Sequence, residues 1–205
     1  WLRGDLEQNG TTADGYPQFT SVREPSYVLT NAKDEANEAV SLSFNVAKDY
    51  DNGLSWQLGY AYNDAKDVQP MNSSVAFSNY VFSAFFDPQA EVLSTSDWNT
   101  EHRMTGLVEY EKAFFKDYMT TISAFGFMRS GRPYSATFNG TIDPFGFTPY
   151  LDFVDNTLRP GAERNGFESG WWGKVDLRLE QELPGVMENH RTKAFLTIDN
   201  FTNLL

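Results

Sequence analysis

The sequence lacks cysteine, a long apolar run and an excess of basic residues. Without cysteine the chain has no disulfide framework, no thiolate metal site and no thiol nucleophile. No stretch of about 18 consecutive apolar residues occurs, which excludes a transmembrane helix. The 28 acidic residues outnumber the 16 basic ones and give a net charge of -12. A nucleic-acid-binding protein needs a basic face to displace counterions from phosphate, so nucleic acid is not an expected partner.

The 205 residues are 40% hydrophobic and 16% aromatic, which is enough apolar material for a folded core. An aromatic share of this size also argues against intrinsic disorder. The average composition is that of a soluble acidic domain. A transmembrane β-barrel gives the same average, because its apolar outer face alternates with a polar lumen face and its loops are polar. Composition therefore leaves both classes open.

The clearest pattern is the alternation of apolar and polar residues that is typical of β-strands. It runs through 40–47 and, after the hairpin-type turn sequence Asp51-Asn52-Gly53, resumes through 54–63. Its apolar positions are Val40, Leu42, Phe44, Val46, Leu54, Trp56, Leu58, Tyr60 and Tyr62. Each strand is about ten residues long, enough to cross a bilayer at the tilt of a barrel, whereas strands of soluble proteins more often have five or six.

Similar runs predict further strands at 103–110, 118–128, 174–180, 193–201 and, as a short strand, 27–30. In the 118–128 strand the facing is unclear, because Phe125 and Phe127 oppose Ile122 and Ala124. Helical periodicity is weak throughout the chain. The fold class predicted from these patterns is all-β and antiparallel.

The connections between the predicted strands fall into two lengths. Those at 49–53, 112–117 and 183–191 are short, and those at 64–100 and 131–170 are long and rich in Asn, Ser, Pro, Gly and Phe. Because antiparallel strands alternate in direction, the short and the long connections lie at opposite ends of the sheet. Long loops at one end and tight turns at the other are typical of outer-membrane barrels, and loops of this length are uncommon in compact soluble domains.

Aromatic residues gather near the predicted strand ends, where amphipathic rings suit a membrane interface. They are Tyr50, Trp56, Tyr60, Tyr62, Phe114, Phe115, Tyr118, Trp171 and Trp172. A soluble β-sandwich core also uses aromatic residues. The polar run of Asp176, Arg178 and Glu180 fits a wet lumen or the solvent face of a soluble sheet equally well. The pattern alone leaves the barrel and the sandwich as alternatives.

An ordered set of segments resembles the C-terminal half of the barrel of TonB-dependent outer-membrane receptors, and most closely the Oar-like group. The resemblance covers roughly 26–205, and each segment alone is weakly specific. The segments are Tyr27-Val28-Leu29-Thr30-Asn31, the run from Asn52 to Ala65, the pair His102-Arg103, Ser130-Gly131-Arg132-Pro133-Tyr134-Ser135, and Asp199-Asn200-Phe201-Thr202-Asn203-Leu204.

The resemblance implies a 22-stranded barrel in the cell outer membrane, closed by an N-terminal plug. It implies uptake of a substrate driven by the TonB energy-transducing complex, which would act through regions outside this chain. Outer-membrane lipids and lipopolysaccharide are then expected partners, and a surface lipoprotein is a further candidate partner. The substrate is unknown. About seven or eight predicted strands cannot close such a barrel, and no plug is recognised. We therefore expect 1–205 to be a C-terminal portion of the receptor barrel.

Residues with reactive side chains form few promising groups. His102 and His190 lie far apart in sequence, with no partner at metal-ligand spacing. A hydrolase could pair His102 with Ser96, but a structural histidine is the preferred interpretation. Asp64 and Asp67 could bind Ca²⁺, as could Asp152 and Asp155, although neither pair has the spacing of a calcium loop. We therefore predict no catalytic, metal-binding or cofactor-binding residue and no enzyme activity.

Two features of the long loops are open to a binding role. Arg132 either sits in a turn where a strand leaves the barrel or contacts an anionic substrate. The aromatic segment 138–153, with Phe145, Phe147, Tyr150 and Phe153, either binds a ligand or partner or packs on neighbouring loops. The functional alternative to transport is a secreted or surface β-sandwich adhesin or carbohydrate-binding module.

Overall fold

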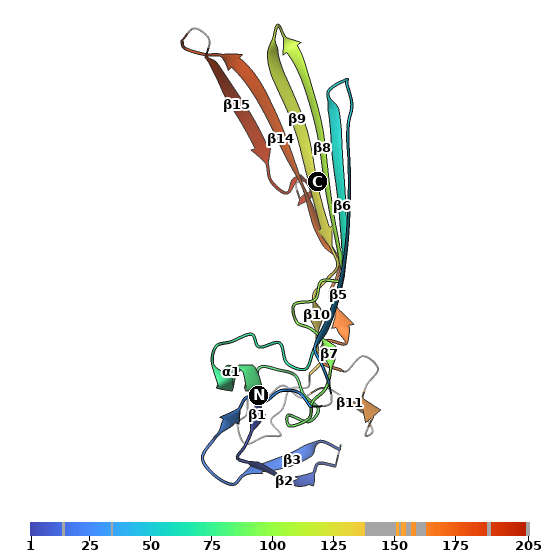
Figure 1. Ribbon diagram of the computed structural model, residues 1–205, viewed down its shortest axis with the longest axis vertical. Helices are drawn as coiled ribbons and strands as arrows, with labels where there is room; N and C mark the ends of the chain where they lie inside the picture. Colours follow the sequence, from blue (N-terminus) through green and yellow to red (C-terminus); the bar gives the residue numbers. More distant parts are fainter. Residues whose placement is uncertain are drawn as a thin grey trace. The chain divides into compact units, whose positions relative to one another are not determined.

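The computed structural model shows a chain that is mostly β-sheet, as the sequence predicts (Figure 1). It describes residues 1–13, 15–33, 35–137, 151, 153–154, 157–158, 163–187 and 190–203. The chain divides into two compact units. Unit 1 comprises 1–40, 64–99 and 132–169, and unit 2 comprises 41–63, 100–131 and 170–205. No helix in the described ranges is long and apolar enough to span a membrane.

Unit 2 is built on one sheet of long antiparallel strands. In spatial order they are β5 (Glu38–Asp49), β6 (Leu54–Asp67), β8 (His102–Phe115), β9 (Tyr118–Arg129), β14 (Trp172–Pro184) and β15 (Arg191–Ile198). Each strand lies next to the long strand that precedes or follows it in the chain, so the sheet is an up-and-down meander. The six long strands predicted from alternation are confirmed. Four of them run several residues beyond their predicted ends.

The register places apolar residues beside one another across the whole sheet. One row joins Trp56, Val108, Ala124, Leu177 and Ile198, and the next joins Leu54, Tyr110, Ile122, Leu179 and Leu196. Since side chains alternate between faces along a strand, matched rows collect these residues on one face, which we call the apolar face. The sequence leaves unclear which residues of β9 share a face, and the pairing of β9 with β8 and β14 settles this. Ile122 and Ala124 lie on the apolar face, and Phe125 and Phe127 lie on the opposite, polar face.

The predicted C-terminal end of the last strand is wrong. It was expected to reach Phe201, but β15 ends at Ile198 and a short 3₁₀ helix, η1, covers Phe201–Asn203. Asn200 has a φ of 55°, in the left-handed region that asparagine tolerates better than most residues. Its backbone N–H donates a hydrogen bond of 2.7 Å to Oδ1 of Asp176 on β14. This turn therefore ends the strand before the alternation in the sequence does.

Unit 1 contains the short strand predicted at 27–30, of which the structure forms only the first two residues, and it also gives structure to the two long connections. Its strands form two-stranded antiparallel pairs, and β7 adds to the end of β6. The pairs are β1 (Leu2–Arg3) with β4 (Tyr27–Val28), β2 (Leu6–Thr11) with β3 (Pro17–Ser21), β10 (Pro133–Tyr134) with β13 (Phe167–Glu168), and β11 (Phe153–Val154) with β12 (Thr157–Leu158). The two-residue strand β7 is Ser94–Thr95, and the helix α1 is Ala76–Val81. The fully buried apolar side chains include Tyr80 and Val81 of α1.

The turn between β5 and β6 depends on one glycine. Gly53 has a φ of 90°, which favours residues without a Cβ. A Cβ built there would lie 2.0 Å from the backbone oxygen of Glu111 on β8, and that strand also donates a 2.8 Å hydrogen bond to the Gly53 carbonyl. The tight approach of β8 to the turn therefore requires glycine.

We expect Gly53→Ala to lower the free energy of unfolding by about 1–3 kcal/mol, because it combines backbone strain with a steric clash. Gly170→Ala is the matched control, since nothing lies within 4 Å of a Cβ at that position. Denaturant titration of both variants gives the comparison. Equal stability of the two would show that the turn does not require glycine.

Candidate functional site

The most unusual feature of unit 2 is that its apolar face is uncovered. The part of the chain that the structure describes places a single sheet in unit 2, with no second layer of its own. Leu58, Val108 and Ile122 in the middle of this face are 51%, 46% and 50% exposed. Soluble monomers rarely expose contiguous apolar patches of more than a few hundred Å², and larger ones mark protein or membrane interaction sites. The apolar face is therefore the first candidate functional surface.

Aromatic side chains border the apolar face at the end of the sheet where β8 begins. The rings of His102 and Trp171 stack with centroids 5.7 Å apart. The hydroxyl of Tyr60 lies 2.9 Å from Nδ1 of His102, and Tyr62 pairs with His102 across the strands. Tyr60 and Tyr62 lie inside β6 rather than at its end, because β6 continues to Asp67. They nevertheless face the first residues of β8.

Further aromatic residues border the opposite end of the same face. Nε1 of Trp56 lies 3.5 Å from the hydroxyl of Tyr50, and the rings of Tyr110 and Phe114 are 6.5 Å apart. On β8, His102 is separated from Tyr110 and Phe114 by 8 and 12 positions. At about 3.4 Å per residue and a strand tilt of about 40° from the membrane normal, these separations correspond to roughly 20–30 Å along that normal. This height matches the apolar band of roughly 25 Å in outer-membrane barrels.

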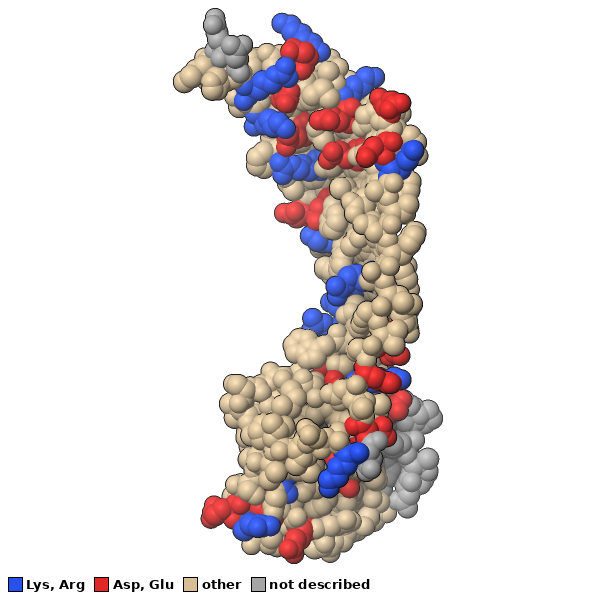
Figure 2. All heavy atoms as spheres, viewed as in Figure 1, with Lys and Arg blue, Asp and Glu red and all other residues tan. Residues whose placement is uncertain are grey.

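The polar face of β14 and β15 carries paired charges. Four ion pairs lie there with nitrogen–oxygen distances between 2.6 and 2.9 Å: Lys174–Asp176, Arg178–Glu180, Lys193–Glu180 and Arg191–Glu182. Figure 2 shows basic and acidic side chains intermingled over the end of the sheet where β14 turns into β15. On β14 the two faces therefore differ, with Val175, Leu177 and Leu179 on the apolar face and paired charges on the polar face.

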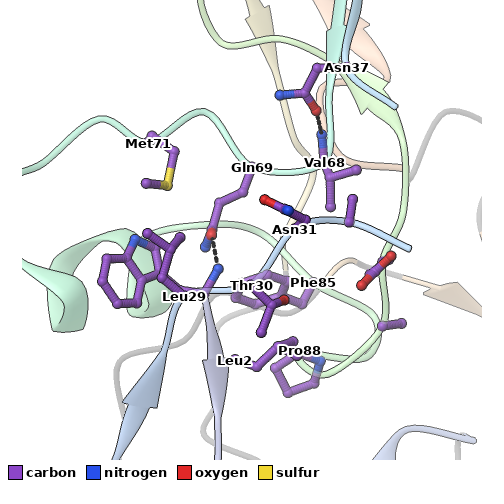
Figure 3. Close-up of a pocket in the computed structure, with 14 residues that line it drawn as sticks. Leu2, Leu29, Thr30, Asn31, Asn37, Val68, Gln69, Met71, Phe85 and Pro88 are labelled. Carbon is purple, nitrogen blue, oxygen red and sulfur yellow. Dashed lines mark hydrogen bonds between the residues drawn. The ribbon is translucent and has the colours of Figure 1, made fainter. Parts of the chain in front are cut away.

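Unit 1 contains the second candidate, a pocket of about 260 Å³ shown in Figure 3. Its apolar wall includes Leu2, Leu29 and Phe85, and its polar groups include Asn31, Gln69 and Glu91. Asn37 helps to shape it by accepting a 3.0 Å hydrogen bond at Oδ1 from the backbone N–H of Val68. The lining offers apolar contact and hydrogen-bonding groups to a small ligand.

A buried ion pair holds the base of unit 1 together. Arg3 and Asp5 have fully buried side chains, and their hydrogen bonds Nε–Oδ1 and Nη2–Oδ2 measure 2.7 and 2.5 Å. Asp5 also accepts hydrogen bonds from the hydroxyl of Ser21 and the backbone N–H of Ser26. The Arg3 guanidinium, followed by these further donors, holds the pKa of Asp5 well below its usual range. No sequence pattern indicated this pair, because charged residues in a loop resemble solvated ones.

The reactive residues singled out in the sequence have structural contacts. The ring nitrogens of His102 face the Tyr60 hydroxyl and, at 3.5 Å, the Glu101 carboxylate. The hydroxyl of Ser96 accepts a hydrogen bond from the backbone N–H of Trp98. His190 is exposed, and its backbone N–H bonds to the Met187 carbonyl.

The first acidic pair considered for Ca²⁺, Asp64 and Asp67, contacts basic side chains. Asp67 is nearly buried and receives 2.9 Å bonds from both Nη atoms of Arg164. Asp64 lies 4.0 Å from Lys66. Over the described ranges, no group of three His, Asp or Glu side chains could hold a metal ion. The second pair, Asp152 and Asp155, lies outside the described residues.

Arg132 lies in the connection between β9 and β10. Its backbone N–H donates a 2.8 Å bond to the Ser169 hydroxyl and its carbonyl accepts a 3.0 Å bond from the Ser169 N–H, while its side chain is exposed. The backbone forms no turn at 130–132, so the predicted turn is not confirmed. The aromatic residues Phe145, Phe147 and Tyr150 lie outside the described residues, as does the side chain of Phe153.

These features define an all-β chain with a two-faced, single-layer sheet and a small packed unit formed by its long connections. No family model, no curated protein and no solved structure matches the chain. Its function must therefore follow from the geometry of the sheet and of the loops.

We expect Asp5→Asn to destabilise unit 1 by about 3 kcal/mol, because it leaves the buried Arg3 charge without its partner. The lowered pKa means that the carboxylate stabilises the fold above pH 4 and loses this effect as the pH falls through the range below it. Wild-type unit 1 should therefore become more susceptible to proteolysis below pH 4. The variant should be susceptible already at pH 7.

The exposed Glu24 provides the control, and Glu24→Gln should leave the pH profile unchanged. Limited proteolysis with an acid-active protease, followed by mass spectrometry of the cleavage sites, makes the measurement. If Asp5→Asn resisted proteolysis like wild type at pH 7, the pair would not hold unit 1.

Proposed function

We propose that this chain is part of the β-barrel of a TonB-dependent, Oar-like receptor in the outer membrane, and that it serves active uptake of a substrate. The chain would form barrel wall and extracellular loops. It would bind and guide substrate without covalent chemistry. The TonB complex and a plug would act through regions outside this chain.

The observation that carries the proposal is the continuous apolar face. It is in register across five neighbouring strands, and the alternation of Val40, Leu42, Phe44 and Val46 extends it to β5. Five of the six strands have 12 to 14 residues, above the length that a tilted transmembrane strand needs. Lipid acyl chains can cover such a face without a second protein layer, and the bordering aromatic rings suit the interfaces.

The lengths of the connections between strands also support an outer-membrane barrel and indicate its orientation. Short turns join β5 to β6, β8 to β9 and β14 to β15, whereas the connections after β6 and β9 are long. Outer-membrane barrels keep short turns on the periplasmic side and long loops outside. In this orientation unit 1 would lie on the cell surface, where its pocket of about 260 Å³ could contact substrate or a surface lipoprotein. Lipopolysaccharide would then surround the loop end of the strands.

The edges of the sheet suit a larger barrel. Among the described strands, β5 and β15 each pair with one long neighbour, so each leaves a row of backbone groups for another strand. In lipid, unpaired backbone groups cost several kcal/mol each, so only a closed barrel satisfies them. We propose that strands from the rest of a 22-stranded receptor pair with these edges.

The β-sandwich adhesin or carbohydrate-binding module has less support. A sandwich buries the inner face of one sheet against a second sheet of similar size. Within the described ranges, the remaining sheets have two strands each and all belong to unit 1. No sheet of comparable size is available in unit 2 to cover Leu58, Val108 and Ile122.

We expect the full-length protein to be recovered in the outer-membrane fraction of the cells that produce it. It should resist extraction with high salt and show a gel mobility that changes on heating, as folded barrels do. Density-gradient fractionation with inner-membrane and periplasmic marker proteins as controls makes the test. Recovery as soluble periplasmic or secreted protein would contradict the proposal.

A further inference from the structure

Two arginines lie directly opposite each other on the polar face. Arg103 of β8 pairs in register with Arg129 of β9, and Arg129 pairs in turn with Trp172 of β14. The Cβ atoms of such opposite residues lie about 5 Å apart, and like charges at this separation destabilise a sheet. The guanidinium carbon of Arg129 lies 5.7 Å from the centre of the Trp172 ring. The sheet therefore places two positive charges on neighbouring strands, and the one on Arg129 lies against an aromatic ring.

These two arginines differ from the basic residues of β14 and β15 on the same face. Lys174, Arg178, Arg191 and Lys193 each form an ion pair of 2.6 to 2.9 Å. Over the described part of the chain, neither Arg103 nor Arg129 has an ion-pair partner at that distance. Among the described residues of the polar face, the cations of β14 and β15 are thus paired with carboxylates, whereas Arg103 and Arg129 are not, which favours binding of an anion beside them.

A hollow adjoins this pair of arginines. Gly59 and Ala61 of β6 are the cross-strand partners of Thr105 and Arg103, and their small size leaves space above the sheet. The hollow is open to the surface, has a volume of about 440 Å³ and is lined by Ser43, Phe44, Asn45, Gly59, Tyr60, Ala61, Arg103 and Thr105. A Cβ at Gly59 would lie 2.7 Å from Oγ1 of Thr105. Ser43, Asn45 and Thr105 therefore bring hydroxyl and amide groups to an open hollow that also includes the cation of Arg103.

We infer that Arg103, Arg129 and this hollow form a binding site for an acidic saccharide. Its carboxylate or phosphate group would bridge the two guanidinium groups, whose planar forks match such anions. Its hydroxyl groups would bond to Ser43, Asn45 and Thr105, and a sugar ring could lie against the half-exposed Trp172. The inference deepens the proposed transport function, because the polar face of a barrel lines the path of the substrate.

The test measures binding to purified full-length protein in detergent by isothermal titration calorimetry. The probes are trigalacturonate, which carries carboxylates, glucose 6-phosphate, which carries a phosphate, and maltotriose, which is neutral. We expect binding of at least one acidic probe and at least tenfold weaker binding of maltotriose. The acidic probe that binds more tightly identifies which anion the site prefers.

The double variant Arg103→Gln/Arg129→Gln should weaken binding of the acidic probe by at least tenfold. Arg178→Gln is the matched control, because it removes an ion-paired arginine from the same face and should leave binding unchanged. Equal binding by the double variant and wild type, or no binding of either acidic probe by wild type, would overturn the inference. Fractionation of the same variants keeps the two proposals separate, because a protein that reaches the outer membrane but binds neither probe refutes only the site.

Discussion

Side chains alternate between the two faces of a β-strand, and everything else in unit 2 depends on six strands keeping that alternation in step. A shift of one residue between β8 and β9 would move Ile122 from the apolar to the polar face and bring Phe125 in the opposite direction. Tight turns prevent such a shift. At the first turn, Gly53 admits the backbone of Glu111 at a distance that a side chain would forbid. The residues at the turns thus fix the register of the strands. The register in turn places apolar and polar side chains on opposite faces of the sheet.

The two units are stabilised in different ways. In unit 2, backbone hydrogen bonds run between long strands, and the apolar face has no protein layer of its own over the described residues. Its stability therefore depends on what covers that face. In unit 1 the largest buried side chains include charged ones. The pair Asp67–Arg164 joins the two long connections, and Asp5 of the pair Arg3–Asp5 also bonds to Ser21 and Ser26 within the N-terminal segment. Buried ion pairs contribute little net stability, but breaking one is costly, so they favour one arrangement of the loops over others.

The sequence predicted the long strands because their signal is local. Alternation from Val40 to Val46 and from Leu54 to Tyr62 required no knowledge of partners, and the Asp-Asn-Gly turn between them marked the hairpin. The facing of β9 could not be predicted, because Phe125 and Phe127 are as apolar as Ile122, and only pairing with β8 and β14 decides between them. The end of β15 was missed because an asparagine in a left-handed conformation does not interrupt the alternation.

The candidate sites were less predictable than the strands. The cross-strand neighbours Arg103 and Arg129 are 26 positions apart in the chain, and only the register of β8 and β9 brings them together. The Arg3–Asp5 pair and the pocket of unit 1 depend on contacts between segments that resemble ordinary loops. Arg132, the arginine that the sequence did single out, lies in the connection between β9 and β10, where its backbone bonds to Ser169.

The central claim is that lipid covers the apolar face, and adjacent positions on β9 test it most directly. These 205 residues contain no cysteine, so Ile122→Cys and Ser123→Cys can each be made in a full-length protein from which any other cysteine has been removed, and labelled with an environment-sensitive fluorophore. In full-length protein reconstituted into phospholipid vesicles, the label at 122 should be quenched by doxyl-labelled lipid and the label at 123 by aqueous iodide. Quenching of neither label by lipid, with 122 shielded from both quenchers, would contradict the account and indicate a protein core.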